Sequence, residues 1–381
     1  MQTGLKVSDG QFNIHELRTE DRRSLKANYR ILIAASVLLF VVSMCVRTTA
    51  VGLMNPVETF HNLIVWIHLK CSQLVNGPYY FHRFAIVEGL PTLTDTVQRL
   101  FLTVITFLCG ALLALSGSIF QTVFRNPIAA PTMLGVATGV KVGFLMLVLQ
   151  YESAAYVMTK QKYEYCYACA VGMLALVLIM GKISSGRKKF SVFDLLIVGA
   201  LLSQIVGAVI QHYVYSMDND LALVYQQVSG ALIVNTDATS FVALGSVTLI
   251  TVIPMFLMRF SFNGLGFDND ESRSLGINTG AMKIITLIIG SMMITAAMVH
   301  CGSVGMISLI VPFISRSIFG ADYQDSFWSN ILIGGGLMVL CRDIISLIPF
   351  GDYGLPIGTV VDFIALPVFV VIVAAGRRTW E

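Results

Sequence analysis

The sequence contains few charged residues. Asp, Glu, Lys and Arg make up 12% of its 381 residues, whereas soluble domains carry about 25%. Hydrophobic residues reach 56%, and the mean hydropathy is +0.77. This composition excludes an ordinary soluble domain. It predicts a polytopic membrane protein whose surroundings are the lipid bilayer.

Catalytic and metal-binding motifs are also missing. The sequence has no HExxH, no GxSxG and no Walker-type loop, because Gly181-Lys182 is followed by Ile183. Its seven cysteines are scattered, and the CxxC of Cys166 and Cys169 has no second pair or histidine cluster beside it. We favour small membrane residues as the interpretation of this pair, with a redox pair as the alternative. We therefore expect no catalytic residues, no metal site and no bound cofactor in this chain.

A cleavable signal peptide is not evident, because residues 1–27 are polar and lack an apolar core. We interpret them as a cytoplasmic N-terminal tail. Residues 28–377 are expected to form a single all-α transmembrane domain of about ten helices. The ten apolar segments are 28–46, 98–124, 132–150, 164–182, 193–216, 238–260, 282–301, 304–319, 328–349 and 356–376.

Basic residues predict the orientation of these segments. By the positive-inside rule, the cluster before the first segment places the N-terminus in the cytoplasm. That cluster is Arg18, Arg22, Arg23, Lys26 and Arg30. With ten spans, the C-terminal Arg377 and Arg378 fall on the same side, whereas Lys160 and Lys162 lie outside and oppose the bias. Both termini are therefore expected to be cytoplasmic.

Two outer connections are expected to contain helices. Within the long connection 47–96, residues 57–74 place apolar side chains near helical spacing, together with Trp66 and His68. This pattern predicts an amphipathic helix at the membrane surface. The outer loop 218–230 is expected to contain a short helix.

The stretch 100–143 is interpreted as a membrane hairpin inside a tightly packed bundle. Its two apolar runs flank an Asn126-Pro127 turn, whose polar groups must be satisfied by protein or water. Small residues along the runs allow close approach of another helix. They are Gly110, Ala114, Ser116, Gly117, Ser118, Gly135, Ala137, Gly139 and Gly143.

The most polar internal stretch is 266–278. Its acidic beginning, followed by Arg273, suits a short cytoplasmic helix, and Gly276 is a position where that helix could stop. A solvated loop is the alternative. Because most other inner loops are far shorter, we favour a docking surface for a cytoplasmic partner.

Polar groups inside the later segments suggest further roles. Gly302 and Gly305 follow His300 and predict a helix break that lines a cavity. We favour a histidine satisfied by backbone or water over one that contacts a ligand or senses pH. The pair Arg342-Asp343 is expected to face the bundle interior. Asp362 is a candidate for a subunit interface.

Four stretches of the chain resemble motifs of the FecCD-type permeases, which belong to iron-siderophore, haem and vitamin B12 ABC importers. The resemblance spans roughly 95–376. Its first part is the hairpin signature: Leu115-Ser-Gly117, Gln121, Arg125-Asn-Pro-Ile-Ala-Ala-Pro131 and Leu134-Gly-Val136 with Gly139. The others are Glu271-Ser-Arg-Ser-Leu-Gly-Ile-Asn278, Gly302-Ser-Val-Gly-Met-Ile-Ser-Leu-Ile-Val-Pro312, and Leu355-Pro-Ile-Gly-Thr-Val-Val361 with Pro367.

The resemblance implies a type II ABC importer permease of ten helices in a bacterial cytoplasmic membrane. Two permease subunits would surround a pathway, with a cytoplasmic ATPase dimer that binds ATP and Mg, and an extracellular substrate-binding protein. The cargo would be a ferric siderophore or a similar metal chelate, moved by alternating access; haem and corrinoids stay open. No nucleic acid partner is expected. The alternative is a secondary transporter driven by an ion gradient.

The resemblance also assigns roles to individual residues. The ATPase-coupling residues would be Asp268, Asp270, Glu271, Arg273, Ser274, Leu275 and Gly276. The pathway residues would be Gln121, Asn126, Pro127, Leu134, Gly135, Gly302 and Gly305. Arg99 would dock the binding protein.

Some family positions are altered in this chain. The R-x-P-R motif is Thr96-Val-Gln-Arg99, which keeps only the second arginine, and a later arginine is replaced by Leu347. The histidine after the Val-Val-Pro motif is Phe313, and Gly354 replaces a glutamate. A homodimer would lose charge-assisted contacts to the binding protein. We therefore expect a heterodimer whose second permease subunit supplies the missing groups.

Overall fold

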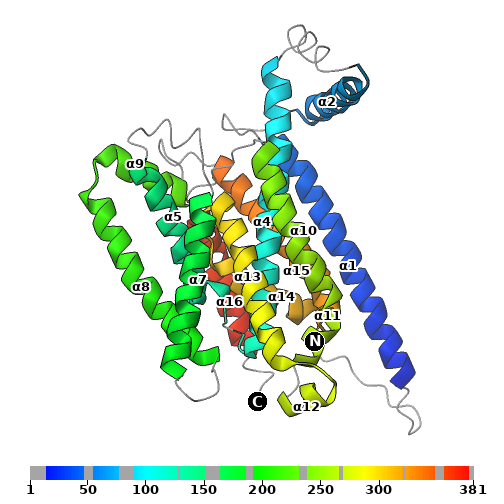
Figure 1. Cartoon of the computed structure of the whole chain (residues 1–381). Helices are drawn as coiled ribbons and strands as arrows, with labels where there is room; N and C mark the ends of the chain where they lie inside the picture. The colour runs from blue at the N-terminus through cyan, green and yellow to red at the C-terminus, as the bar shows by residue number, and fades with distance from the viewer. Residues whose placement is uncertain are drawn as a thin grey trace.

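The computed structural model describes residues 14–46, 55–76, 90–127, 129–150, 164–185, 192–230, 238–265, 269–320, 322–347 and 356–376. Within them the chain is a bundle of helices (Figure 1). The first half contains α1 (Ile14–Cys45), α2 (Pro56–Asn76), α4 (Leu90–Phe124), the 3₁₀ helix η1 (Pro131–Leu134), α5 (Val136–Gln150), α7 (Glu164–Ser185) and α8 (Val192–Ser216). The second half contains α9 (Asn219–Gly230), α10 (Ala238–Leu257), α11 (Arg259–Leu265), α12 (Asn269–Ser274), α13 (Thr279–Cys301), α14 (Met306–Phe319), α15 (Tyr323–Leu347) and α16 (Ile357–Gly376).

Each of the ten predicted apolar segments contains helix, with a break inside 132–150 and a bend inside 238–260, so the all-α prediction is confirmed. Among the described residues, six helices are long and apolar enough to cross a membrane, and the bent pair α10–α11 adds one further candidate span. The helices α5, α14 and α16 are shorter and apolar. This set is consistent with ten spans.

Helix α4 lies at the centre of the bundle, where it packs against α13, α14 and α15. The approach to α15 is so close that a Cβ on Gly110 would lie 2.2 Å from the carbonyl oxygen of Gly334. A Cβ on Gly117 would lie 1.6 Å from the carbonyl oxygen of Ser308 on α14. The predicted small residues therefore serve helix packing, as in other membrane bundles.

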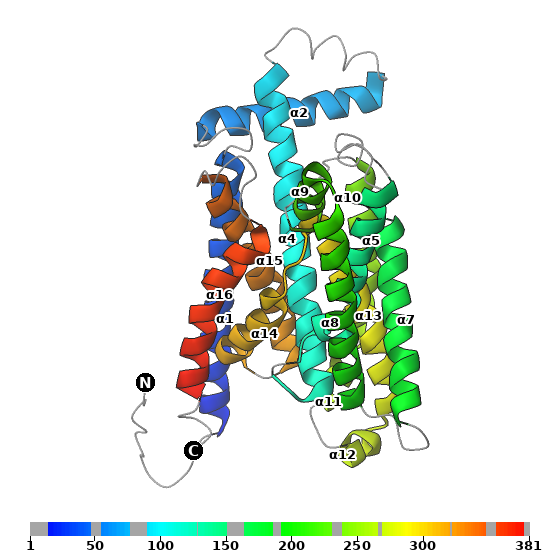
Figure 2. The same cartoon turned by 90° about the vertical axis from the view of Figure 1, so that its left-hand side faces the viewer.

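The two ends of the bundle differ. Helix α12 lies at the end where α1 begins and α16 ends, whereas α2 and α9 lie at the opposite end (Figure 1). Figure 2 shows α2 lying across the upper part of α4. The Trp66 ring of α2 meets the Phe101 ring of α4 edge to face, and Asn62 Nδ2 donates to Thr96 Oγ1 at 3.4 Å. A helix thus occupies the predicted amphipathic stretch, and α9 occupies the predicted short helix.

Candidate functional site

The predicted coupling segment forms a short exposed helix at one end of the bundle. Its residues Asp270, Glu271, Arg273, Ser274, Leu275 and Gly276 are exposed, whereas Asp268 lies outside the described residues. Leu275, a large apolar side chain among these charged neighbours, is 62% exposed. The segment therefore presents a mixed charged and apolar surface.

The local sequence explains where this helix ends. Gly276 has a φ of 78°, and its N–H donates to the Arg273 carbonyl at 2.9 Å. The Ile277 N–H donates to the Ser272 carbonyl at 3.1 Å, which completes the Schellman pattern of a helix that stops at glycine. The next residue, Asn278, caps α13, because its Oδ1 accepts from the Ala281 N–H at 3.1 Å. The predicted stop at Gly276 is confirmed.

Helix α12 is attached to α11, a helix that the sequence did not reveal. We expected one continuous segment over 238–260, but the chain bends by 62° between α10 and α11. Pro254 lies inside α10, one turn before the bend, and proline is a usual cause of such kinks. The buried Ser272 hydroxyl of α12 donates to the Gly264 carbonyl of α11 at 2.7 Å. This bond fixes one face of α12 and leaves the other exposed.

The hairpin turn after α4 lies beside α11. Arg125 has a φ of 49°, and its Nε donates to the Leu265 carbonyl at 3.2 Å. Gln121 is buried; its Nε2 donates to the Leu309 carbonyl of α14 at 2.9 Å, and its Oε1 accepts from Arg316. Asn126 and Pro127 are exposed. Of these predicted pathway residues, Gln121 thus holds two helices together, and only the turn itself reaches the surface.

The remaining predicted pathway residues lie at breaks between helices. Leu134 is buried where η1 meets Gly199 of α8, and Gly135 follows it with a φ of 76°. At the second break, Gly302 has a φ of 72° and ends α13, and Gly305 precedes α14. The roles of these residues in a pathway stay predictions.

The second break packs against two other elements. The Ser303 N–H donates to the Ser229 carbonyl at the end of α9, at 3.2 Å. A Cβ on Gly358 of α16 would lie 2.4 Å from the Ser303 carbonyl oxygen. The buried His300 ring lies one turn earlier, with Nδ1 2.9 Å from the Ala296 carbonyl oxygen. This backbone contact agrees with the favoured interpretation of His300.

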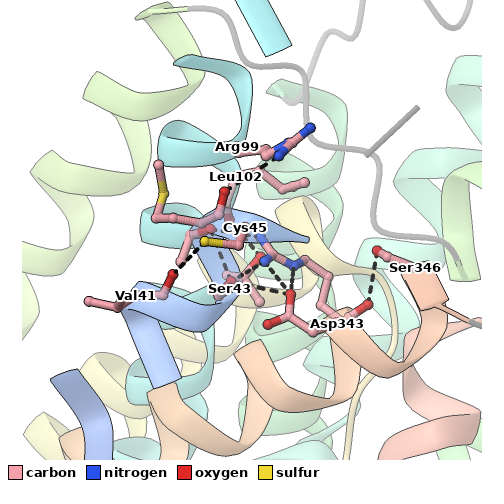
Figure 3. A network of polar contacts seen from close by, with 11 residues as sticks. Val41, Ser43, Cys45, Arg99, Leu102, Asp343 and Ser346 are labelled. Atoms are coloured by element: carbon pink, nitrogen blue, oxygen red, sulfur yellow. Dashed lines mark hydrogen bonds and ion pairs between the residues drawn. The ribbon is translucent and has the colours of Figure 1, made fainter. Parts of the chain in front are cut away.

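The Arg342-Asp343 pair faces the bundle interior, as predicted, with exposed fractions of 5% and 6%. Arg342 Nε donates to Asp343 Oδ1 at 2.9 Å, and Nη1 donates to Thr103 Oγ1 of α4 at 3.0 Å. Ser43 of α1 donates to the same carboxylate oxygen at 3.2 Å. Figure 3 shows this network, which joins α1, α4 and α15.

Arg99 lies near this network. Its side chain is 1% exposed, and Nη1 donates to the Met44 carbonyl at the end of α1, at 3.4 Å (Figure 3). The guanidinium is therefore covered by protein in this structure instead of facing outward. Its predicted contact with a binding protein remains a prediction, one that requires the surrounding segments to open.

Exposed polar groups also occur on apolar helices. Asp362 is exposed on α16, next to Phe363, which is 76% exposed. Gln204 and Gln211 are exposed on α8 at a spacing of two helical turns. Burying such groups in lipid is costly, so these faces are suited to contact protein or water. Within the described residues, no group of three or more His, Cys, Asp or Glu side chains could hold a metal ion.

Comparisons with known proteins point to one family. The model of the FecCD transport family matches residues 84–375. A probable iron chelatin transport system permease protein of Helicobacter pylori is 28% identical over 271 residues, which cover 71% of this chain and 79% of that protein. A vitamin B12 import system permease protein of Citrobacter koseri is 28% identical over 286 residues, 74% of this chain and 82% of that protein.

Solved structures share the fold. A protein described as a metal-chelate type ABC transporter, in an inward-facing conformation, matches 93% of this chain and 99% of its own, with a TM-score of 0.68 and 20% identity.

Proposed function

The chain belongs to the FecCD transport family and is a permease subunit of an ABC importer, and we propose that it carries a ferric siderophore or a similar metal chelate into the cytoplasm. Because the chain has no Walker-type loop, ATP and Mg would bind a separate ATPase dimer. The relatives named for iron chelatin and vitamin B12 support a bulky chelate as cargo.

The exposed surface of α12 and the residues after it is the observation that carries this proposal. In our proposal a cytoplasmic ATPase seats the apolar Leu275 in a pocket, with Glu271 and Arg273 making charged contacts at its rim. An apolar anchor surrounded by polar groups is the usual composition of a protein interface. The end of the bundle that contains α12 would then face the cytoplasm, together with both termini. The membrane would be that of a bacterial cell.

The cargo pathway would run along the face that contains α8, α14 and α16. Figure 2 shows these helices following one another across the side turned to the viewer. Asp362 on α16 and Gln204 and Gln211 on α8 would face the pathway or a second permease subunit, where their polar groups avoid lipid. Helix movements driven by ATP would open this pathway to each side in turn.

The second permease subunit is proposed to be a different chain. Thr96 and Leu347 stand where family members carry arginines, and Arg99 is buried, so this chain offers few cations to an acidic binding protein. A partner permease that keeps those arginines would restore charge-assisted contacts. Full uptake by complexes that contain only this permease would contradict the heterodimer.

The first experiment is purification of the tagged chain from its native membrane in mild detergent, with mass spectrometry of every partner. We expect an ABC ATPase, a second permease and a substrate-binding protein. The Leu275→Asp variant should lose the ATPase, whereas Ser246→Ala, exposed on α10, should retain it.

The second experiment measures uptake by the assembled complex in liposomes. The complex should take up ⁵⁵Fe-siderophore only when ATP is present on the side of the membrane that α12 faces. Uptake that follows a sodium or proton gradient without ATP would contradict the proposal.

A further inference from the structure

Helix α11 occupies a position between the coupling helix and the centre of the bundle. It follows the 62° bend at the end of α10 and packs against α4 and α15. Its seven residues begin at Arg259 and end at Leu265, just before the coupling segment. Its buried residues are Phe262, Gly264 and Leu265. The C-terminal half of α11 is therefore mostly buried, although Phe260 near its start is 61% exposed, whereas most of α12 is at the surface.

The first bond of α11 is to the coupling helix. Ser272 is 0% exposed, and its hydroxyl donates to the Gly264 carbonyl at 2.7 Å. A Cβ on Gly264 would lie 2.1 Å from Ile277 Cδ1, so Ile277, three residues after the end of α12, packs directly over α11. A displacement of α12 must therefore break these contacts or carry α11 with it.

The second bond of α11 is to the turn at the end of α4. Arg125 Nε donates to the Leu265 carbonyl at 3.2 Å, at the C-terminal end of α11. Helices are short of hydrogen-bond donors at this end, and a cationic donor is favoured there. Gln121, one turn earlier, is bonded to Leu309 and Arg316 of α14. Helix α11 is thus joined to α4, and through α4 to α14.

The third connection of α11, made by two hydrogen bonds, is to the start of α15. Asn263 Nδ2 donates to Asp322 Oδ1 at 2.7 Å, and Asn263 Oδ1 accepts from the Tyr323 N–H at 2.6 Å. The rings of Phe262 and Tyr323 lie 4.9 Å apart between centroids. Asp322 Oδ1 also accepts from the Gln324 N–H at 2.8 Å, so it caps the first turn of α15. One side chain of α11 therefore holds the end of a spanning helix.

We propose that α11 is the element that transmits movement of α12 to α4 and α15, with Ser272, Asn263 and Asp322 as positioning residues. The inference rests on the proposed function, in which an ATPase moves α12. Side-chain bonds to three other helices make α11 and its neighbours move as one body. Without these bonds, ATP hydrolysis would displace α12 but would not rearrange the helices that surround the cargo.

The test compares cargo uptake with ATP hydrolysis in the complete complex, reconstituted in liposomes. Ser272→Ala and Asn263→Ala should leave ATP hydrolysis by the partner ATPase near its original rate. Cargo taken up per ATP should fall roughly fivefold or more, the size of typical coupling between linked sites. Ser246→Ala is the matched control, because its hydroxyl donates only to Ala243 in its own helix, and it should change neither quantity.

A pair of variants at Asp322 separates coupling from folding. Asp322→Asn retains an oxygen that can accept from Asn263 and Gln324, and should keep the original uptake per ATP. Asp322→Ala removes that oxygen and should lower it. If all variants assemble and keep the original ratio, the inference is wrong while the proposed function stands. If the unsubstituted complex takes up no chelate with ATP, the proposed function itself fails.

Discussion

At the scale of single residues, glycines decide how closely the central helices approach. The Cβ that alanine would add at Gly117 would lie 1.6 Å from the Ser308 carbonyl oxygen, an atom of the backbone that cannot rotate away. The helices would have to separate. By contrast, no atom beyond the adjacent residues and backbone of its own helix lies within 4 Å of the Cβ position of Gly172 on α7, so alanine fits there without any shift.

Gly117→Ala is therefore expected to destabilise the protein by about 1–3 kcal/mol, the usual cost of overpacking a core. Gly172→Ala should be neutral or slightly stabilising, because alanine favours helix over glycine. The measurement is the fraction of each variant that stays monodisperse in detergent after heating across a temperature series. Equal midpoints for the two variants would show that α4 and α14 are not packed as described.

The Arg342-Asp343 pair gives a second prediction at this scale. Asp343→Leu or Arg342→Met leaves the other residue charged and buried, and should cost about 3–5 kcal/mol. The double variant Arg342→Met/Asp343→Leu removes both charges and should recover much of that loss. Thermal unfolding in detergent measures the three variants. If the double variant loses the sum of the single losses, the two residues do not interact.

Sequence reasoning identified these residues but not their partners. Gly110 and Gly117 were expected to permit close packing because they are small and lie in an apolar run. That Gly117 meets Ser308, and Arg342 meets Thr103, depends on contacts between helices that are distant in the chain. No local pattern in the sequence contains this information.

At the scale of elements, the proposed coupling segment owes its shape to one glycine. Gly276 has a left-handed φ of 78°, and no atom beyond its two chain neighbours lies within 4 Å of its Cβ position. Any effect of alanine there would come from the backbone alone. The exposed arrangement of Glu271, Arg273 and Leu275 depends on this stop.

Gly276→Ala is expected to destabilise the end of α12 by about 1–2 kcal/mol, the cost of a left-handed conformation for a residue with a side chain. Hydrogen exchange of the backbone amides of residues 269–278 should become faster, and the ATPase should bind more weakly. Gly280→Ala is the control, because Gly280 lies in the first turn of α13 and its Cβ position meets only Asn278 Oδ1 at 3.6 Å. Unchanged exchange in Gly276→Ala would contradict the role of this residue.

Helix positions were predicted well, but the bend at α11 was not. Apolar runs determine where helices form, because the backbone must satisfy its own hydrogen bonds in lipid. The direction of a helix after Pro254 depends on what it packs against, here Tyr323 and the turn at Arg125. A proline within an apolar segment is the one sequence signal that could have located the bend.

At the scale of the whole molecule, the elements are distributed between two ends of the bundle. Helix α12 lies at one end, and α2 and α9 lie at the other (Figure 2). The basic residues before the first span and after the last predict that the α12 end is cytoplasmic.

This orientation predicts the accessibility of introduced thiols. Ser274→Cys on α12 should react with a membrane-impermeant maleimide only in inside-out vesicles, and His61→Cys on α2 only in right-side-out vesicles. The unsubstituted chain provides the background, because most of its described cysteines are buried. Labelling of both positions from the same side would contradict the orientation.

The sequence by itself determined that the protein is an all-helical membrane permease, where its helices other than α11 lie and where α12 stops. These properties depend on hydropathy and on the backbone geometry of neighbouring residues, which are local. Only the tertiary structure decided that Ser272 is buried while Ser274 is exposed, that Arg99 is covered, and that α11 joins α12 to the bundle. Burial and contact between distant segments are properties of packing, and helices that look alike in sequence pack against different partners.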